Sequence, residues 1–310
     1  MLAEVLASFG RQHWIRELPP QGKSPWEGKQ RIAVTRGRRQ DYCVGDIVQI
    51  EAIGDDQAVI NQLVPRRNLL LRSDQFRRKH IAANIDQIGL VLAAEPPFSE
   101  ALAVRVLVAA TIASIPVTWL INKSDCVDAL KKIESRLELY RAMSLPMIHL
   151  SALHDGRAEL SKGALGQWLQ GKSSLLLGQS GMGKSTLVNR LVPDADLKTQ
   201  QWSRALNSGK HTTSFSKSFD LPEDFFQAGS RVIDSPGFQQ FGLAHCSRSE
   251  IEHSLPEWTD RLGQCRYHNC RHLQEPDCVI RGATERGEID SFRYQMWVDM
   301  LEEQTHQADG

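Results

Sequence analysis

Short runs in which apolar and polar residues alternate occupy the first 80 residues of the chain. The runs cover residues 31–35, 46–50 and 58–60. Alternation with period two is typical of half-buried strands, and turn residues such as Gly37, Gly45 and Gly54 separate the runs. Strands this short and closely spaced predict a small β-barrel, and an oligonucleotide-binding (OB) barrel of Greek-key type suits the pattern. We therefore expect a β-barrel domain in residues 1–80.

Between residues 81 and 242, short apolar runs alternate with longer segments whose apolar residues recur with helical periodicity. Buried strands are expected at 85–94, 117–121, 147–150, 174–177 and 230–233, and helices at 100–113 and 127–140. Strands that alternate with helices predict a parallel sheet that is covered on both faces. Ligands of such sheets bind at the carboxyl ends of the strands, so the loops that follow the strands are the expected place of the chemistry.

A glycine-rich loop follows the apolar run 174–177 and precedes an amphipathic helix. Its residues are Gly178, Gln179, Ser180, Gly181, Met182, Gly183, Lys184, Ser185 and Thr186. Glycines in this context let backbone N–H groups point at phosphate oxygens, and the helix N-terminus adds positive charge. Lys184 then reaches the outer phosphates and Ser185 holds Mg²⁺, as in phosphate-binding loops. A glycine turn that matches by coincidence is the alternative, but the flanking strand and helix favour a nucleoside triphosphate site.

A second loop with chemistry follows the strand at 117–121. It contains Asn122, Lys123, Ser124 and Asp125. Guanine presents two adjacent donors, and one carboxylate such as that of Asp125 can accept from both, whereas adenine lacks this pair. We expect Asn122 to tie the loop to neighbouring backbone and the Lys123 stem to cover the purine. A polar turn with Ser124 or Asp125 as the helix N-cap is the alternative.

Three further segments complete a candidate guanine nucleotide site. Ser151 and Ala152 follow the next strand, where their backbone can offer N–H groups to the guanine carbonyl. Asp234 and Gly237, in Asp-Ser-Pro-Gly, follow the strand at 230–233, where they can hold the Mg²⁺ shell and sense the γ-phosphate. The threonines at 212 and 213 can close on Mg²⁺ when a γ-phosphate is present. Turn chemistry explains the Ser-Pro-Gly sequence equally, and a polar loop explains the threonines.

The loops are those of a GTPase, but their order along the chain is circularly permuted. This order resembles the RsgA family of GTPases, which depend on the small ribosomal subunit, and the resemblance extends from Val44-Gly45-Asp46 to the cysteine-rich tail. It implies an enzyme that hydrolyses GTP to GDP and phosphate, binds the 30S subunit and 16S rRNA, and acts in late subunit maturation. It also implies three parts: an OB-type barrel (1–80), a permuted GTPase domain (81–242) and a zinc-binding, mostly helical domain (243–310). The permuted order leads the 234–237 loop almost directly into the tail, so nucleotide state can move the tail.

The tail contains three thiols and an imidazole within fourteen residues, a closed four-ligand set of the kind that structural zinc prefers. Cys265, Cys270, His272 and Cys278 match the spacing of the family, and His268 competes for the fourth place. Buried free thiols are the alternative. The isolated cysteines at 43, 126 and 246 are interpreted as packing residues, and an amphipathic helix is expected at 285–303.

Catalysis requires a group other than the glutamine that many GTPases place after their Asp-x-x-Gly loop. This chain has Phe238 at that position, as the family does. By resemblance and by chemistry, His211 is the candidate that orients water, beside Lys184, Thr212 and Thr213 in the catalytic set. A solvent-exposed loop histidine explains His211 equally. Some related GTPases bind K⁺ through an Asn where Gly181 stands, which leaves a specific K⁺ ligand open.

Composition adds few constraints to this hypothesis. The net charge is zero, so nucleic acid must meet a local patch. Six basic residues between Arg66 and Lys79 form either such a patch or a solvated face. The start of the chain lacks a signal-peptide pattern, and the apolar stretch 106–121 is too short for a membrane span, so a cytoplasmic protein is expected. We also expect it to be a monomer.

Two alternative functions remain. One is a metal-delivery GTPase that uses the Cys/His cluster, which predicts exchangeable metal. The other is an RNA-binding module that nucleotide merely regulates, which predicts negligible turnover. A closed Cys₃His set instead predicts one tightly held structural zinc per chain.

Overall fold

A computed structural model describes residues 1–19, 28–36, 41–73, 78–195 and 215–308. The chain forms two compact units. The first unit comprises Met1–Leu71, His80–Phe98 and Ile115–Gln239, and the second comprises Arg72–Lys79, Ser99–Ser114 and Gln240–Gly310. Within the described ranges, every helix is too short or too polar to cross a lipid bilayer.

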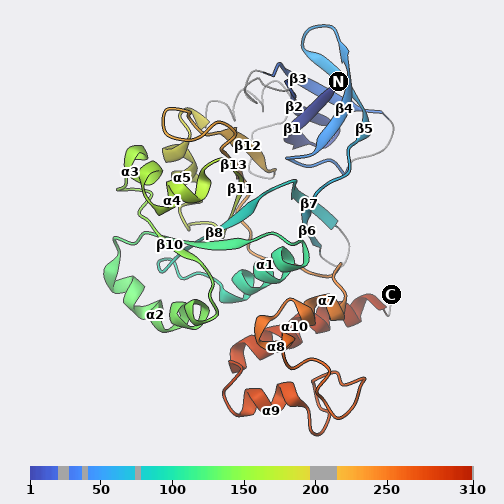
Figure 1. Ribbon diagram of the computed structural model, residues 1–310, viewed down its shortest axis with the longest axis vertical. Coiled ribbons are helices and arrows are strands. Elements are labelled where there is room, and N and C mark those ends of the chain that lie inside the picture. Colours follow the sequence, from blue (N-terminus) through green and yellow to red (C-terminus); the bar gives the residue numbers. More distant parts are fainter. Residues whose placement is uncertain (20–27, 37–40, 74–77, 196–214, 309–310) are drawn as a thin grey trace. The chain divides into compact units, whose positions relative to one another are not determined.

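The first unit begins with a closed five-stranded barrel (Figure 1). Its strands are β1 (Leu2–Phe9), β2 (Gln12–Glu17), β3 (Gln30–Thr35), β4 (Ile47–Ile53) and β5 (Gln57–Leu63). They pair in the order β1-β2-β3-β5-β4, and β4 returns to β1 and closes the barrel. Only the β3–β5 pair in this barrel is parallel, and apolar side chains such as Val5, Ile15 and Ile60 fill its interior. The structure thus confirms the predicted barrel and adds two strands, β1 and β2, that the sequence pattern did not reveal.

The rest of the first unit contains the predicted parallel sheet. Its strands run in the order β10 (Met147–His149), β9 (Val117–Asn122), β8 (Gln87–Ala93), β11 (Ser173–Leu177), β13 (Arg231–Asp234) and β12 (Lys217–Asp220). All neighbours are parallel except β12, which is antiparallel to β13. Every residue of β8 is buried, as expected of a central parallel strand. The helices in the described part of this unit are α2 (Val127–Ala142), α3 (Arg157–Lys162), α4 (Ala164–Leu169) and α5 (Lys184–Leu191).

Barrel and parallel sheet are continuous through β12. One edge of β12 pairs with β13, and the other pairs with β1, where Ala7 lies opposite Lys217. Two ion pairs accompany this junction: Arg16 of β2 bonds Asp220 of β12 at 2.5 Å, and Arg231 of β13 bonds Glu4 of β1. Three of these four side chains are at most 14% exposed, so water screens their charges weakly.

The segment after the barrel is held by its own arginines. Arg66 donates to both carboxylate oxygens of Asp46, at 2.6 and 2.8 Å, and Arg67 donates to Asp86 at 2.7 Å. Asp46 is fully buried and also accepts from the Cys43 N–H. These two arginines of the basic run 66–79 therefore form ion pairs within the protein. We had expected the run to be either a solvated face or a patch that binds phosphates, and neither interpretation included such pairs.

Leu69–Ser73 (β6) and Arg78–Ala83 (β7) pair as a separate two-stranded sheet. Helices dominate the second unit: α1 (Glu100–Ile112), α7 (Arg248–His253), α8 (Pro256–Thr259), α9 (Val279–Glu285) and α10 (Ser291–Ala308). The Ser99 hydroxyl caps α1, and Arg105 of α1 bonds Glu303 of α10 at 2.7 Å.

The predicted helix at 285–303 begins later than expected. Helix α9 ends at Glu285 and α10 starts only at Ser291. Gly287 lies between them with φ +75°, a left-handed conformation that ends helices and that glycine adopts without a Cβ clash. The amphipathic pattern therefore corresponds to α10, and a turn separates this helix from α9.

The buried Asp46–Arg66 pair yields a stability prediction. Asp46→Asn removes the carboxylate charge and leaves the Arg66 guanidinium, whose side chain is 13% exposed, without its counter-ion. We expect the free energy of unfolding to fall by about 3–5 kcal/mol, the typical cost of breaking a buried pair from one side. Asp55→Asn is the matched control, because that carboxylate is 96% exposed beside Lys29 and should change stability by less than about 1 kcal/mol. Urea denaturation of both variants checks this, and equal midpoints would contradict it.

Candidate functional site

The glycine-rich loop lies where β11 ends and α5 begins. Gly181 and Gly183 both have φ +86°, and a Cβ on Gly183 would lie 2.2 Å from the Asn122 amide nitrogen. Glycine is therefore required at Gly183 by conformation and by space. The loop opens onto the first turn of α5, whose N-terminus favours an anion.

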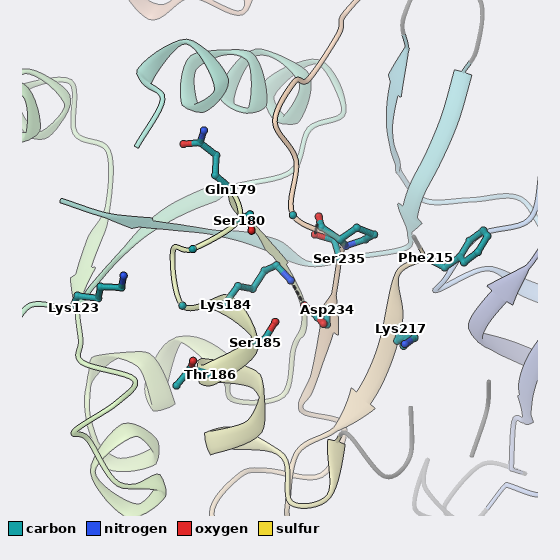
Figure 2. A pocket seen from close by; sticks show the side chains of 14 residues that line it. Lys123, Gln179, Ser180, Lys184, Ser185, Thr186, Phe215, Lys217, Asp234 and Ser235 are labelled. Carbon is teal, nitrogen blue, oxygen red and sulfur yellow. Dashed lines mark hydrogen bonds and ion pairs between the residues drawn. The ribbon is translucent and has the colours of Figure 1, made fainter. Parts of the chain in front are cut away.

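This loop lines a cavity of about 410 Å³ (Figure 2). Its lining comprises Lys123, Gln179, Ser180, Gly181, Gly183, Lys184, Ser185, Thr186, Phe215, Lys217, Asp234, Ser235, Pro236 and Gly237. Figure 2 shows Lys184 reaching from α5 to Asp234 at the end of β13, with which it forms an ion pair. Lys184 is buried, and this ion pair balances its charge.

Asn122 connects three of the candidate loops. It is buried at the end of β9, where its side-chain nitrogen donates to the Met182 carbonyl at 2.8 Å and its oxygen accepts from the Ala152 N–H at 2.9 Å. One side-chain amide therefore links the 122–125 loop to both the phosphate loop and the 151–152 loop. Lys123 lines the cavity and donates to the Glu95 carbonyl at 2.7 Å.

Asp125 lies beside Ser151, although the two are far apart in the chain. The Ser151 hydroxyl donates to one oxygen of the Asp125 carboxylate at 2.5 Å, and this hydrogen bond lowers the pKa of that carboxyl. The second oxygen lies 3.5 Å from His154 Nε2. An ionised, oriented carboxylate that is 38% exposed can accept two donors from a ligand.

The backbone of the neighbouring loops is already engaged. The Ser151 N–H donates to Asp155 at 2.7 Å, and the Ser124 N–H donates to the Leu150 carbonyl at 3.1 Å. Together with the Ala152 bond to Asn122, these contacts fix the loops around Asp125. The Ala152 N–H, which we expected to be available to the guanine carbonyl, thus has a protein partner in this structure.

The loop after β13 packs against the phosphate loop. A Cβ on Gly237 would lie 3.1 Å from the Ser180 backbone nitrogen, and the Phe238 N–H donates to the Gly178 carbonyl at 3.2 Å. The Phe238 side chain is buried and has no group that can orient water. Ser235 donates to the Leu176 carbonyl at 2.7 Å and anchors this loop to β11.

The residues His211, Thr212 and Thr213 lie outside the described residues, so their catalytic assignment stays a prediction. Two cavity-lining residues that follow them, Phe215 and Lys217, were missed from the sequence. Phe215 also contacts the ring of Phe9 at 5.4 Å between centroids. The only sequence signal for this strand is the period-two spacing of Phe215, Lys217 and Phe219. A four-residue strand with mostly polar residues is hard to distinguish from a loop by its sequence.

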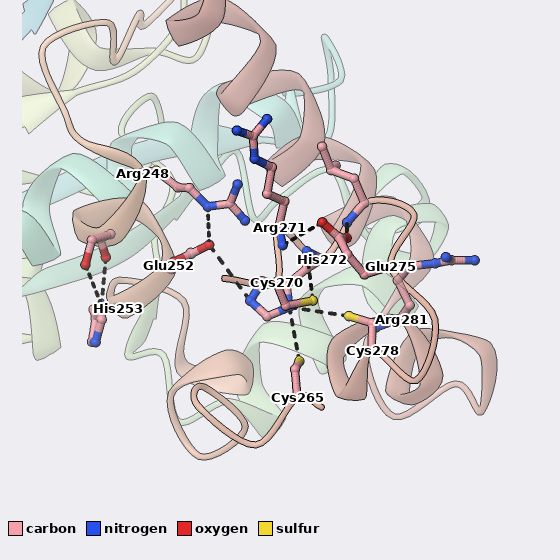
Figure 3. Close-up of polar contacts among 12 residues, drawn as sticks. Arg248, Glu252, His253, Cys265, Cys270, Arg271, His272, Glu275, Cys278 and Arg281 are labelled. Atoms are coloured by element: carbon pink, nitrogen blue, oxygen red, sulfur yellow. Dashed lines mark hydrogen bonds and ion pairs between the residues drawn. The ribbon is translucent and has the colours of Figure 1, made fainter. Parts of the chain in front are cut away.

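Four potential metal ligands converge in the second unit (Figure 3). The ligand atoms of Cys265, Cys270, His272 and Cys278 all lie within 4.8 Å of one another. His272 Nδ1 lies 3.5 Å from the Cys265 sulfur and 3.3 Å from the Cys278 sulfur. His268 is exposed and does not belong to this group.

The surroundings of the cluster fit a bound cation. Burial raises the pKa of the Cys270 thiol to about 12, so thiolates here require a positive charge nearby. The other imidazole nitrogen, His272 Nε2, lies 3.9 Å from Glu252, which itself accepts from Arg248 at 2.7 Å. A carboxylate behind a ligating histidine commonly orients the ring toward a metal. Three thiolates and one imidazole form a closed, tetrahedral donor set of the kind that zinc occupies in structural sites.

Comparison with known proteins gives consistent matches. The profile of the RsgA GTPase family matches residues 63–244. The small ribosomal subunit biogenesis GTPase RsgA of Ralstonia pickettii (strain 12J) is 47% identical over 272 residues, covering 88% of this chain and 85% of the relative. The crystal structure of YjeQ from Thermotoga maritima is similar with a TM-score of 0.68 and 27% identity, covering 98% of both chains. YloQ, described as a circularly permuted GTPase, shares the fold at a TM-score of 0.65 and 23% identity, covering 99% of this chain and 95% of that one.

Asp125 gives a prediction about base choice. Asp125→Asn replaces an acceptor oxygen with a donor, so guanine loses a charge-assisted contact while the 2-oxo group of xanthine gains a partner. We expect GTP affinity to fall by about a hundredfold or more and the affinity for xanthosine triphosphate to rise. Fluorescence titration with both nucleotides checks this.

The matched control is Asp128→Asn, three residues further along, whose side chain is 94% exposed on α2. It should leave both affinities unchanged. Equal ATP and GTP binding by the unmodified protein would contradict the assignment of Asp125.

Proposed function

The chain belongs to the RsgA family of GTPases, and from this premise we propose how it binds GTP and how it acts on the small ribosomal subunit. It is a GTP hydrolase of small-subunit biogenesis, with Mg²⁺ as the partner of the nucleotide. The observation that carries the assignment is the cavity that brings the phosphate loop, Lys184 and Asp234 together.

The nucleotide lies along the carboxyl ends of three strands in this proposal. Guanine binds Asp125, whose orientation Ser151 maintains, while Asn122 holds the loops and the Lys123 stem covers the base. The phosphates bind the amides of the phosphate loop, and Lys184 leaves Asp234 for the outer phosphates. Charge balance supports this exchange, because Asp234 would then help to hold Mg²⁺ in place of the ammonium group.

The residues around Mg²⁺ would be Ser185 and the carboxylate of Asp234, the latter through water. Bound Mg²⁺ neutralises charge that develops on the phosphates. Thr212 and Thr213 are proposed to close this site when the γ-phosphate is present. His211 is proposed to orient the attacking water, because the Phe238 side chain is apolar and buried.

The partner is proposed to be 16S rRNA within the 30S subunit, which the barrel and the second unit both contact. Barrels of the OB type bind oligonucleotides, and the second unit presents exposed arginines beside an aromatic ring. Arg266 is 65% exposed and its guanidinium lies 5.5 Å from the Tyr267 ring centre. Arg271 on the same loop is also exposed. A monomer that works on ribosomal particles belongs in the cytoplasm, which is where we propose this protein acts.

The Cys₃His cluster is proposed to hold one structural zinc ion. Its four ligand atoms lie within 4.8 Å of one another, which is close enough to complete a tetrahedral shell with no open position on the metal. Glu252 and Arg248 further fix His272, as expected of a permanent site rather than a transfer site. These contacts favour a structural role over metal delivery.

Subunit dependence is the central prediction for activity. Because Phe238 orients no water, the isolated protein should hydrolyse GTP slowly, and 30S subunits should stimulate it, since partner stimulation of GTPases reaches about 10³- to 10⁵-fold. Phosphate contacts dominate RNA affinity, so the stimulation should fall as salt rises. Phosphate release with 30S, with 50S and without particles measures the effect.

Two substitutions in this protein test the same prediction. Lys184→Ala should abolish hydrolysis, and His211→Ala should retain GTP and 30S binding but lose most of the stimulated rate. Turnover that 30S particles leave unchanged at low salt would overturn the proposal.

The zinc proposal has its own test. Cys270→Ser should lose the metal and disturb the second unit, where Trp258 packs at 4.3 Å from Trp297 and 5.7 Å from His272 between ring centres. Elemental analysis should find one zinc per unmodified chain and much less in the variant, with a loss of near-UV circular dichroism. Cys126→Ser is the control, because Cys126 is distant from the cluster in sequence and belongs to the first unit. Unmodified protein without zinc, purified in the absence of chelators, would contradict this assignment.

A further inference from the structure

Helix α5 connects the two halves of the proposed nucleotide site. It begins at Lys184, directly after the phosphate loop, and its eight residues span about 12 Å to Leu191. The C-terminal end of this helix contacts the segment 152–157, which follows the loop around Asp125. One short, regular element therefore has the phosphate loop at one end and the loops that are proposed to bind the base at the other.

Arg190, in the last turn of α5, bonds the 152–157 segment through both its side chain and its backbone. Its Nε donates to the Ala152 carbonyl at 3.2 Å, and its Nη2 donates to the Leu153 carbonyl at 2.7 Å. The Arg190 carbonyl in turn accepts from Nε of Arg157, the first residue of α3, at 2.8 Å. The segment is therefore attached to α5 at both of its ends.

The backbone of Ala152 is held from two directions. Its carbonyl accepts from Arg190, whereas its N–H donates to the side-chain oxygen of Asn122 at 2.9 Å. The hydroxyl of the adjacent Ser151 donates to the Asp125 carboxylate at 2.5 Å. Hydrogen bonds weaken steeply when their geometry departs from linearity, so a shift of the Ala152 peptide would disturb the bond that orients Asp125.

A simpler role for Arg190 would be to offset the negative end of the helix dipole, which any cation in the last turn can do. The observed contacts specify more than this. A guanidinium is planar and holds its donors in a fixed fork, and here two donors of that fork bond successive carbonyls of another loop. Both bonds are charge-assisted, which makes them about twice as strong as neutral ones. This arrangement fixes the position of the loop, whereas a dipole contribution alone would not.

We infer that Arg190 is a positioning residue for guanine recognition: it holds the backbone of Ala152 and Leu153 so that Ser151 orients Asp125 toward the base. The inference rests on the proposed role of Asp125 and extends it to a residue on the phosphate-loop helix. Loss of Arg190 weakens the contacts of Asp125 with N1–H and the 2-amino group of guanine. The phosphates bind at the other end of α5, and their contacts are the same whichever base the nucleotide carries.

Affinities for GDP and inosine diphosphate (IDP), measured on the full-length protein with Mg²⁺, test this inference. Hypoxanthine lacks the 2-amino group of guanine, so the preference for GDP over IDP reports the second contact of Asp125 and cancels the phosphate contacts. For Arg190→Met, we expect this preference to fall by about three- to tenfold, as for a weakened charge-assisted hydrogen bond. Arg190→Lys should give an intermediate preference, because an ammonium group keeps the charge but not the fork. Arg141→Met is the matched control, since the Arg141 side chain is 40% exposed and pairs with Glu134 and Glu138 of its own helix α2.

A double variant tests whether Arg190 acts through Ser151. Ser151→Ala removes the hydroxyl that orients Asp125, so Arg190→Met should lower the GDP preference little further when it is added to Ser151→Ala. Residues that act through a shared contact have non-additive effects. Fully additive losses in the double variant would contradict the inference.

The ratio of the two affinities also separates the remaining outcomes, because it does not depend on the fraction of folded protein. An unchanged ratio in Arg190→Met overturns the inference, whether both affinities stay the same or fall together, since a joint fall indicates a structural effect on the phosphate loop. If the unmodified protein shows no preference for GDP over IDP, the proposed role of Asp125 fails and the inference fails with it. If the unmodified protein prefers GDP and Arg190→Met keeps that preference, the inference alone fails.

Discussion

Parallel alignment of β9, β11 and β13 is the constraint on which the nucleotide cavity depends. Each strand ends at the same edge of the sheet, so the loops that follow them meet regardless of their order in the chain. The buried amide of Asn122 then joins these loops through the Met182 carbonyl and the Ala152 N–H. Circular permutation is tolerated for this reason: it changes which loop comes first but not which strand ends are neighbours.

Local sequence was sufficient for the parts of the site whose chemistry is contiguous. The phosphate loop requires glycines, a lysine and a hydroxyl within nine residues, and the strand and helix around it have clear patterns. The Cys/His cluster is equally compact in sequence. The fold class, a barrel followed by a permuted parallel sheet and a mostly helical tail, could also be predicted, because periodicity changes sharply between these regions.

Features that depend on long-range pairing could not be predicted. Strand β1 carries Glu4 at a buried position, which breaks the apolar pattern until Arg231, more than 200 residues later, supplies its partner. Likewise, Arg66 looked like one member of a basic run, although it pairs with the buried Asp46. The place of Lys217 in the cavity follows from its register with Asp234, and register is not visible in a strand of four residues. In each case, a charged residue is explained only by a partner that the fold brings to it.

Strand β12 has a further consequence for the integrity of the first unit. Its backbone is hydrogen-bonded on one edge to β13 and on the other to β1 of the barrel. A variant that lacks residues 1–80 would lose β1 and leave β12 as an unprotected edge strand. Exposed edges of this kind template pairing with other chains and promote aggregation. The barrel therefore acts as a cap on the enzyme's sheet, and the catalytic domain is not an independent module that can be separated from it without cost.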